Sequence, residues 1–141
     1  MRPAEIQQAV YDAVNVSAVT TLLTSASAET PIWTMGAPQV IDAEAAGNFP
    51  YITLAFLTDD GFTTKDDAGS EALVQVDVWH RTPSELAIKA IARQVFLALH
   101  RVTLAGLTGH ITTECTDMEF MTEDDGVTRR AMVEFRVVSL G

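Results

Sequence analysis

Histidine, cysteine and carboxylate side chains are the groups of this sequence that could catalyse a reaction or bind a metal. His110 and Glu114 share a face of a predicted strand, but two ligands without a third do not form a metal site. Asp77 and His80 are three residues apart in another predicted strand, so they point to opposite faces. Cys115 has no evident basic neighbour to stabilise a thiolate, which favours a buried, inert thiol. The spacing of these groups therefore predicts no active site.

Signals for cofactors, disulfides and membranes are also missing from the sequence. Gly106 and Gly109 do not form a phosphate-binding loop, and the single Cys115 excludes an internal disulfide. No apolar run reaches membrane-spanning length, and the first residues lack the apolar core of a signal peptide. We therefore expect a soluble intracellular protein that is not an enzyme and uses no cofactor, metal ion or membrane.

Length and net charge further limit the class of protein to which this sequence can belong. The 141 residues are expected to form a single domain, 1–141, with a substantial core. Nineteen acidic and nine basic residues give a net charge of −10, which argues against binding to a nucleic-acid backbone. Eleven of the acidic residues lie in two segments, 58–71 and 114–125. These segments are either solvated loops or a functional acidic surface.

A strand followed by a helix, residues 71–101, organises the predicted fold. Ala72, Val74, Val76 and Val78 alternate with more polar residues, as expected for a strand with one face on a core. Thr82-Pro83-Ser84-Glu85 has the pattern of a helix start. Beyond it, one broad apolar face is predicted for the helix, made of Ala87, Ile88, Ile91, Ala92, Val95, Ala98, Leu99 and Val102.

The other elements follow from similar patterns. A helix is predicted over 3–14, and short edge strands are possible at 32–34 and 39–41. Longer strands are predicted over 49–57, 110–121 and 131–137, with a bulge near Thr116-Asp117 where the alternation slips. Residues 58–70 should form a long two-stranded arm or a mobile loop. The fold class is thus α+β, an antiparallel sheet of about four to five strands with two main helices on one face.

Phe96 indicates an apolar surface of the helix that does not pack on the sheet. It projects outside the main apolar face of the helix, near the arc that carries Lys89 and Arg93. Leu86, Ala90 and Leu97 form a second apolar strip beside it. Either residues 24–50 cover Phe96, or this surface packs against another copy of the chain. The sequence favours the second interpretation, a subunit interface containing Leu86, Lys89, Arg93, Phe96 and Leu97.

Several segments together resemble one protein family. They are Phe49-Pro50-Tyr51 entering a strand, the acidic arm, the run from Val76 to Arg81 before a helix, and the run from Asp125 to Ala131. In this order they are similar to tail-completion, or tail-terminator, proteins of long-tailed phages and gene transfer agents. The resemblance implies a small α+β subunit of a sixfold ring that caps the tail tube and joins the head connector. It also implies a virion protein of the tail or neck, assembled in the host cytoplasm.

This resemblance suggests roles for the two acidic segments. Arm residues Asp59, Asp60, Phe62, Lys65, Asp66 and Asp67 are expected to contact a neighbouring subunit or ring. DNA should pass through the ring without specific binding, and Glu123, Asp124 and Asp125 are expected to face that passage. Other neck or baseplate rings would suit the same pattern. From a different class, a small ligand-binding module or enzyme could use the acids around Glu114 to Glu119.

Overall fold

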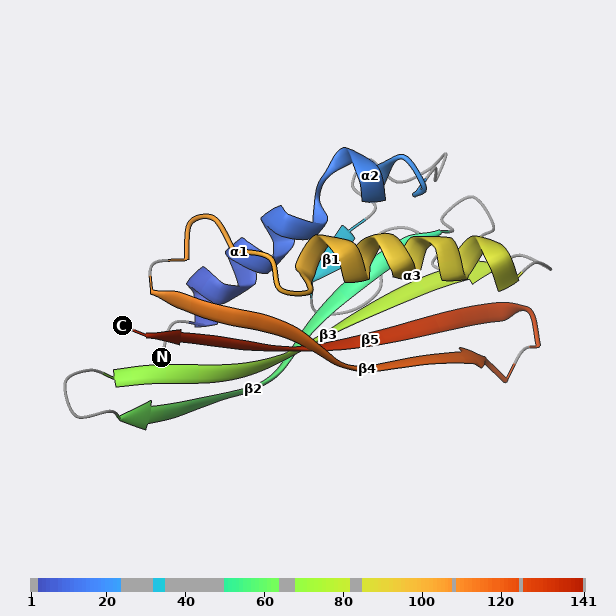
Figure 1. Ribbon diagram of the computed structural model, residues 1–141. Coiled ribbons are helices and arrows are strands. Elements are labelled where there is room, and N and C mark those ends of the chain that lie inside the picture. The colour runs from blue at the N-terminus through green and yellow to red at the C-terminus, as the bar shows by residue number, and fades with distance from the viewer. Residues whose placement is uncertain are drawn as a thin grey trace.

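Helices cover one face of a single sheet in the computed structural model (Figure 1), which describes residues 3–23, 32–34, 50–63, 68–81, 85–107, 109–124 and 126–140. The helices are α1 (Pro3–Val14), α2 (Ser17–Thr20) and α3 (Glu85–Leu99). The strands are β1 (Ile32–Thr34), β2 (Tyr51–Thr63), β3 (Ala68–Arg81), β4 (His110–Thr122) and β5 (Thr128–Leu140). The predicted α+β class is confirmed.

The sheet has the strand order β1-β2-β3-β5-β4. All neighbouring pairs among the four long strands are antiparallel, as predicted. β1 occupies the edge position expected for residues 32–34 and pairs with β2 in parallel, from Ile32↔Ile52 to Thr34↔Leu54. The possible strand at 39–41 and the predicted helix start at 82–84 lie outside the described residues.

The core lies between α3 and the two central strands. Five residues of the predicted apolar face of α3 are buried, and alternate residues of β3 and β5 are buried opposite them. These residues are Ile88, Ile91, Ala92, Val95 and Leu99 of α3, Ala72, Val74, Val76 and Val78 of β3, and Ala131, Val133, Phe135 and Val137 of β5. α1 adds Ile6, Ala9, Val10 and Val14 to the same cluster.

β-bulges interrupt two of the long strands, β2 and β4. In β4 the register with β5 shifts between Cys115 and Asp117, which confirms the bulge predicted from the slipped alternation. Thr113 before the bulge is buried, and Met118 after it packs against the core. In β2 the register with β3 shifts between Phe56 and Thr58. Neither this bulge nor a further register shift between His110 and Thr112 of β4 was predicted from the sequence.

Residues 58–70 are mostly paired strand. Pairing between β2 and β3 runs from Thr58↔Leu73 to Thr63↔Ala68, and β5 lies beside β3 as far as Gly69↔Leu140. In the described part of this segment, the hairpin is therefore the end of the sheet, and a long arm standing clear of the sheet is not seen there. The turn at 64–67 lies outside the described residues.

Candidate subunit interface

Four residues of α3 form a ridge on the exposed side of the helix, hereafter the α3 ridge: Leu86, Ala90, Arg93 and Leu97. Their spacing of four, three and four residues places them along one line of the helix surface. Leu86 is 77% exposed and Leu97 is 49% exposed. The second apolar strip predicted from the sequence is therefore at the surface, on the side of α3 opposite to its buried residues.

Phe96 is less available than the α3 ridge. Its side chain is half-buried, and its ring stacks on His100 with the ring centroids 4.5 Å apart. His100 in turn accepts a hydrogen bond at Nδ1 from the backbone N–H of Cys115, at 3.0 Å. Phe96 thus helps to join α3 to β4 within one chain, so Leu86 and Leu97 are the more exposed members of the predicted interface.

A groove of about 120 Å³ separates the beginning of α3 from the end of β4. Lys89 crosses it, with Nζ 5.5 Å from the centroid of the Phe120 ring, which is 43% exposed. Glu85 forms ion pairs with Lys89 at 3.6 Å and with Arg129 at 3.3 Å. Arg130 also lines the groove, but its guanidinium is bound to Asp77, so the charged side chains in the groove are Lys89, Arg129 and Glu85.

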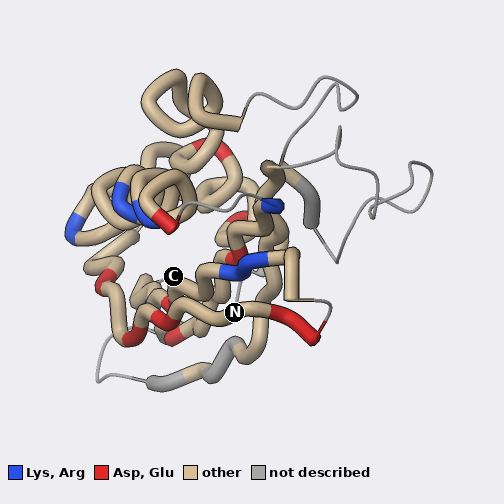
Figure 2. The backbone as a smooth tube through the Cα atoms, turned by 90° about the vertical axis from the view of Figure 1, so that its right-hand side faces the viewer, with Lys and Arg blue, Asp and Glu red and all other residues tan. Residues whose placement is uncertain are grey.

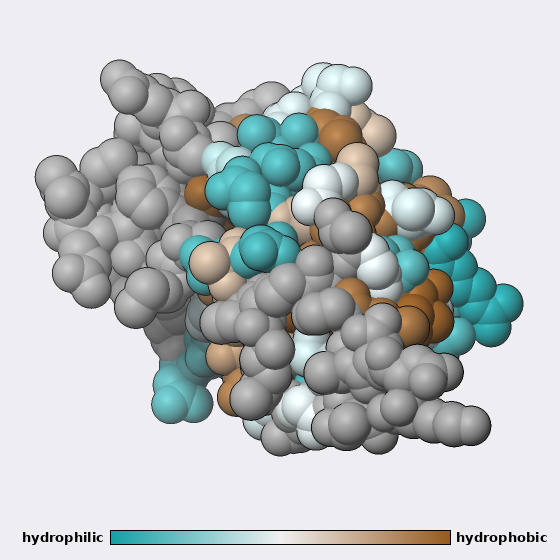
Figure 3. Space-filling view, turned by 90° about the vertical axis from the view of Figure 1, so that its left-hand side faces the viewer, coloured by the Kyte–Doolittle hydropathy of each residue, from teal (hydrophilic) through white to brown (hydrophobic). Residues whose placement is uncertain are grey.

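A second, more apolar groove of about 350 Å³ lies between α1, the end of α3 and residues 102–105. It is lined by Ala9, Asp12, Ala13, Val16, Leu97, Ala98, Val102, Thr103 and Ala105. In Figure 3, hydrophobic residues are visible among hydrophilic ones on the end of the molecule near the connection between α3 and β4. Leu97 belongs to both this groove and the α3 ridge, so the two surfaces are continuous.

The face of the sheet opposite the helices carries a compact polar cluster. Arg130 donates two hydrogen bonds to Asp77, at 3.1 and 3.2 Å, and its guanidinium lies 4.9 Å from the centre of the Trp79 ring. Trp79 donates its indole N–H to Thr53 Oγ1 at 3.0 Å. Because the Asp77 side chain is only 8% exposed and is paired with Arg130, it has a structural role here.

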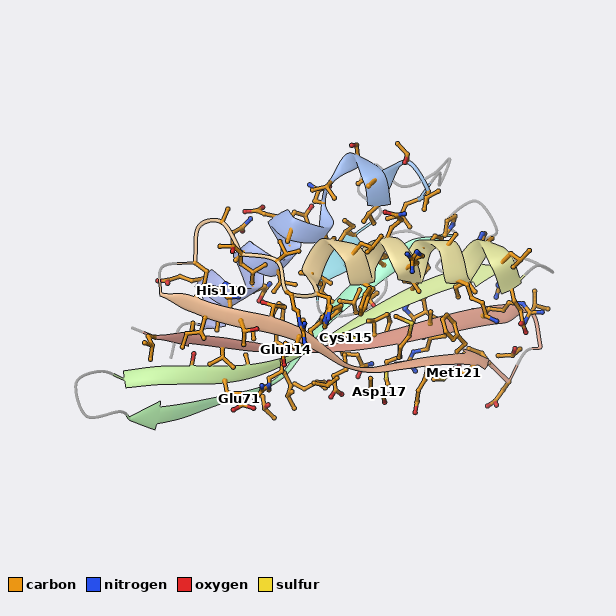
Figure 4. The ribbon with its side chains drawn as sticks, viewed as in Figure 1. Glu71, His110, Glu114, Cys115, Asp117 and Met121 are labelled. Atoms are coloured by element: carbon orange, nitrogen blue, oxygen red, sulfur yellow. The ribbon has the colours of Figure 1, made fainter. Side chains whose placement is uncertain are left out.

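A second polar cluster on this face joins three strands. Arg136 of β5 lies 3.5 Å from Glu71 of β3 and 3.6 Å from Glu114 of β4. Glu71 and Glu114 are labelled in Figure 4. Glu114 also lies 3.9 Å from Arg101. Its carboxylate is therefore held between two arginines, and the grooves described above are not lined by the acids at 114–119. The geometry gives no support to a catalytic pair in this segment.

The other candidate chemical groups have local partners. His110 Nε2 lies 2.7 Å from Thr113 Oγ1, and a register shift between His110 and Thr112 interrupts the alternation from which His110 and Glu114 were expected to share a face. Burial lowers the pKa of His110 and of His80. Burial raises the pKa of the Cys115 thiol, which disfavours a reactive thiolate. Within the described residues, no group of three His, Cys, Asp or Glu side chains could hold a metal ion.

The predicted contact acids are only partly described. Glu123 is half-buried with one carboxylate oxygen enclosed, whereas Asp124 is exposed, and Asp125 lies outside the described residues. Asp59, Asp60 and Phe62 lie in β2, while Lys65, Asp66 and Asp67 fall in the undescribed turn. Figure 2 shows acidic and basic positions on both the helix layer and the sheet layer.

Comparison with known families gives the chain its identity. The family model for tail completion protein gp17 matches residues 8–139. The chain belongs to this family. The resemblance seen in the sequence is therefore confirmed, and the protein is a structural component of a phage-type tail and of the virion. Among the described residues, no helix is long and apolar enough to span a membrane.

Solved structures with the same fold are also found. A chain from the virion of a native gene transfer agent particle aligns with a TM-score of 0.75 and 18% sequence identity, covering 99% of this chain and 97% of that one. Another solved chain aligns with a TM-score of 0.54 and 10% identity, over 96% and 95% of the two chains. No curated protein matches the sequence. At these identities the structural matches establish the fold.

Proposed function

We propose that this tail completion protein forms a closed homo-oligomeric ring, with six subunits as the expected number. The ring caps the finished tail tube, ends tail assembly and offers its other side to the head-completion or connector protein. The observation that carries the proposal is the exposed α3 ridge, because Leu86, 77% exposed, sits on a helix whose opposite face already fills the core. Contacts of one surface with a different surface of the next copy close into rings when the rotation between copies allows it.

The ring function is tested by the mass of the assembly. Native mass spectrometry of the protein mixed with tail tube protein should show one closed oligomer. Leu86→Asp should reduce its abundance without unfolding the subunit, whereas Ile111→Asp, at a side chain 53% exposed on β4, is the matched control. Phe96→Asp is a less specific probe, since Phe96 also stacks on His100. A wild-type protein that stays monomeric on the tube would contradict the ring.

The position of the ring in the particle is a separate question. Antibody labelling or electron microscopy of assembled particles should find the protein at the head-proximal end of the tail tube. A ring at the distal end would instead make it a baseplate component, and one beyond the tube on the head side would make it another neck protein. Neither result would affect the ring itself.

We further propose that DNA passes through the ring, with acidic side chains of the 123–125 turn facing the passage. Acidic groups repel the phosphate backbone, whereas basic groups would bind it by releasing counterions. Replacing Glu123, Asp124 and Asp125 by lysine should therefore slow DNA delivery in particles that assemble normally. Delivery at the wild-type rate would place this turn outside the passage. Because Glu123 is half-buried, Asp124→Lys alone is the variant least expected to disturb folding.

A further inference from the structure

The outer edge of β4 is closed along its first half by the chain's own backbone and side chains. The N–H of Arg101 donates to the carbonyl of Thr113 at 2.6 Å, and the N–H of Cys115 donates to His100 Nδ1 at 3.0 Å. These two groups face away from β5, since backbone groups of successive residues in a strand alternate in direction. The residues that follow α3 therefore occupy the place where another strand could pair with this half of β4.

The second half of β4 is open. The bulge after Cys115 shifts the outward-facing positions to Met118, Phe120 and Thr122, because Glu123 pairs inward with Thr128 at 2.8 Å. Met118 donates its N–H to the Asp117 side chain at 2.9 Å. Beyond Met118, the outward-facing backbone N–H and C=O groups of Phe120 and Thr122 have no hydrogen-bond partner within the described residues. Such an edge can accept a further strand.

The groove between α3 and β4 adjoins this open edge. Phe120 and Thr122 line the groove on the strand side, and Glu85 and Lys89 line it on the helix side. A strand added to β4 would place alternate side chains toward α3, which is how edge strands beside a helix obtain specificity. The charged side chains in the groove are Lys89, Arg129 and Glu85, two basic and one acidic, so the groove suits an incoming segment with acidic residues.

A complementary edge exists on the opposite side of the sheet. β1 pairs with β2 only at residues 52–54, so the outer edge of β2 from 55 to 63 has no strand beside it in the described part of the chain. Leu57 is 48% exposed, and Thr58 and Gly61 are exposed. This edge carries Asp59 and Asp60 and no basic residue up to position 63.

Self-pairing of two β4 edges would join only two copies, because the contact of one edge with itself is isologous and does not continue to a third copy. Pairing β4 with β2 uses two different edges, so it can continue from copy to copy. Charge does not select between these pairings, because Glu119 of β4 and Asp59 and Asp60 of β2 are all acidic. The strand order makes β2 and β4 antiparallel to each other, so a second copy can continue the sheet without changing the alternation of strand direction.

We propose that the open end of β4, residues 118–122, pairs with the outer edge of β2, residues 58–63, of the neighbouring copy. This interface rests on the proposed ring and adds a strand pairing to the contact proposed for the α3 ridge. Each subunit contributes its β4 edge to one neighbour and its β2 edge to the other, so the contact is head-to-tail. Such contacts close into a ring when the rotation between copies allows it. The acidic β2 segment then lies beside Lys89 and Arg129 of the neighbour's groove.

Engineered disulfides test this pairing directly. In a Cys115→Ser background, Phe120→Cys is combined in one chain with cysteine at Thr58, Asp60 or Phe62, since the register is to be found by scanning. Opposed residues in paired strands lie within the Cα separation that a disulfide requires, about 4.4–6.8 Å. At least one double variant should give a ladder of covalent oligomers ending at the mass of the ring. Phe120→Cys alone should give no crosslinked dimer.

The outcomes separate the strand pairing from the ring. A wild-type protein that remains monomeric in native mass spectrometry would overturn the ring, and with it this interface. A wild-type ring in which no double variant crosslinks, or in which Phe120→Cys dimerises alone, would overturn only the pairing of β4 with β2.

Amide hydrogen exchange gives a second readout on the unmodified protein. Exchange at Phe120 and Thr122 should slow by about tenfold or more when the ring forms, because their N–H groups become bonded. Exchange at Cys115 should not change, since its N–H already donates to His100. Unchanged exchange at Phe120 in an assembled ring would contradict the pairing.

Discussion

Leu86→Ala and Ile91→Ala form a matched pair that separates assembly from folding. Both residues lie in α3 and both substitutions remove most of a large aliphatic side chain. Ile91 is 2% exposed in the core, whereas Leu86 is 77% exposed on the α3 ridge. The same loss of apolar atoms should therefore affect the free energy of unfolding in one case and the free energy of association in the other.

The expected magnitudes follow from burial. Ile91→Ala leaves a cavity in the core and should lower the free energy of unfolding by about 2–5 kcal/mol. Leu86→Ala is a surface change in the isolated subunit and should alter that free energy by no more than about 0.5 kcal/mol. If the neighbouring subunit covers the exposed part of Leu86, the lost burial weakens each contact by about 1–2 kcal/mol, or roughly 5–30-fold.

Two measurements are needed on each variant. Urea unfolding gives the free energy of unfolding of the subunit, and native mass spectrometry at several concentrations gives the midpoint of ring formation. The reasoning would be refuted if Leu86→Ala unfolded as easily as Ile91→Ala. It would equally be refuted if Leu86→Ala assembled at the wild-type concentration, because the α3 ridge would then lie outside the contact.

Three further predictions concern single residues. Gly109→Ala should lower the melting temperature far more than Gly106→Ala: both have positive φ, but only at Gly109 would a Cβ collide with the Leu140 carbonyl. Because burial lowers the pKa of folded His80 below the unfolded value of about 6.5, the unfolded state binds more protons, so stability should fall as the pH drops below about 6.5. His80→Gln should reduce that fall in urea titrations, and an unchanged pH profile would exclude His80 as a source. Iodoacetamide at pH 8 should modify Cys115 more slowly in the folded than in the urea-unfolded protein, because burial raises its pKa; equal rates would contradict this.

Local patterns were sufficient to predict most of the elements. The alternation in β3 and the apolar period of α3 identified residues that are buried, such as Val76 and Ile91. The slipped alternation in β4 located its bulge, because one extra residue reverses the face of every residue beyond it. In β2 the run from Leu54 to Leu57 is apolar on both faces, so its bulge left no comparable signal in the sequence.

Contacts between distant residues were much harder to predict. The Asp77–Arg130 pair depends on which strands are neighbours, and β5 lies between β3 and β4 although β4 precedes it in the chain. The stacking of Phe96 on His100 could have been suspected from their spacing of four residues in and just after a helix. The exposure of Leu86 was indicated by its place in the second apolar strip, since a helix on one sheet buries only one face.

The bulge in β4 also determines where the length of this protein can change during evolution. Core-facing residues are Thr113 and Cys115 before the bulge and Met118 after it, so one residue there is surplus to the regular alternation. Deleting Thr116 would restore a regular strand and leave each of these residues on its present face, at the loss of its hydrogen bonds to Glu134. A single deletion elsewhere in β4 would turn the residues on one side of it away from the core. Insertions and deletions among distant relatives should therefore concentrate at this position. Sequence alignments of the family should place a one-residue gap in this strand at the bulge.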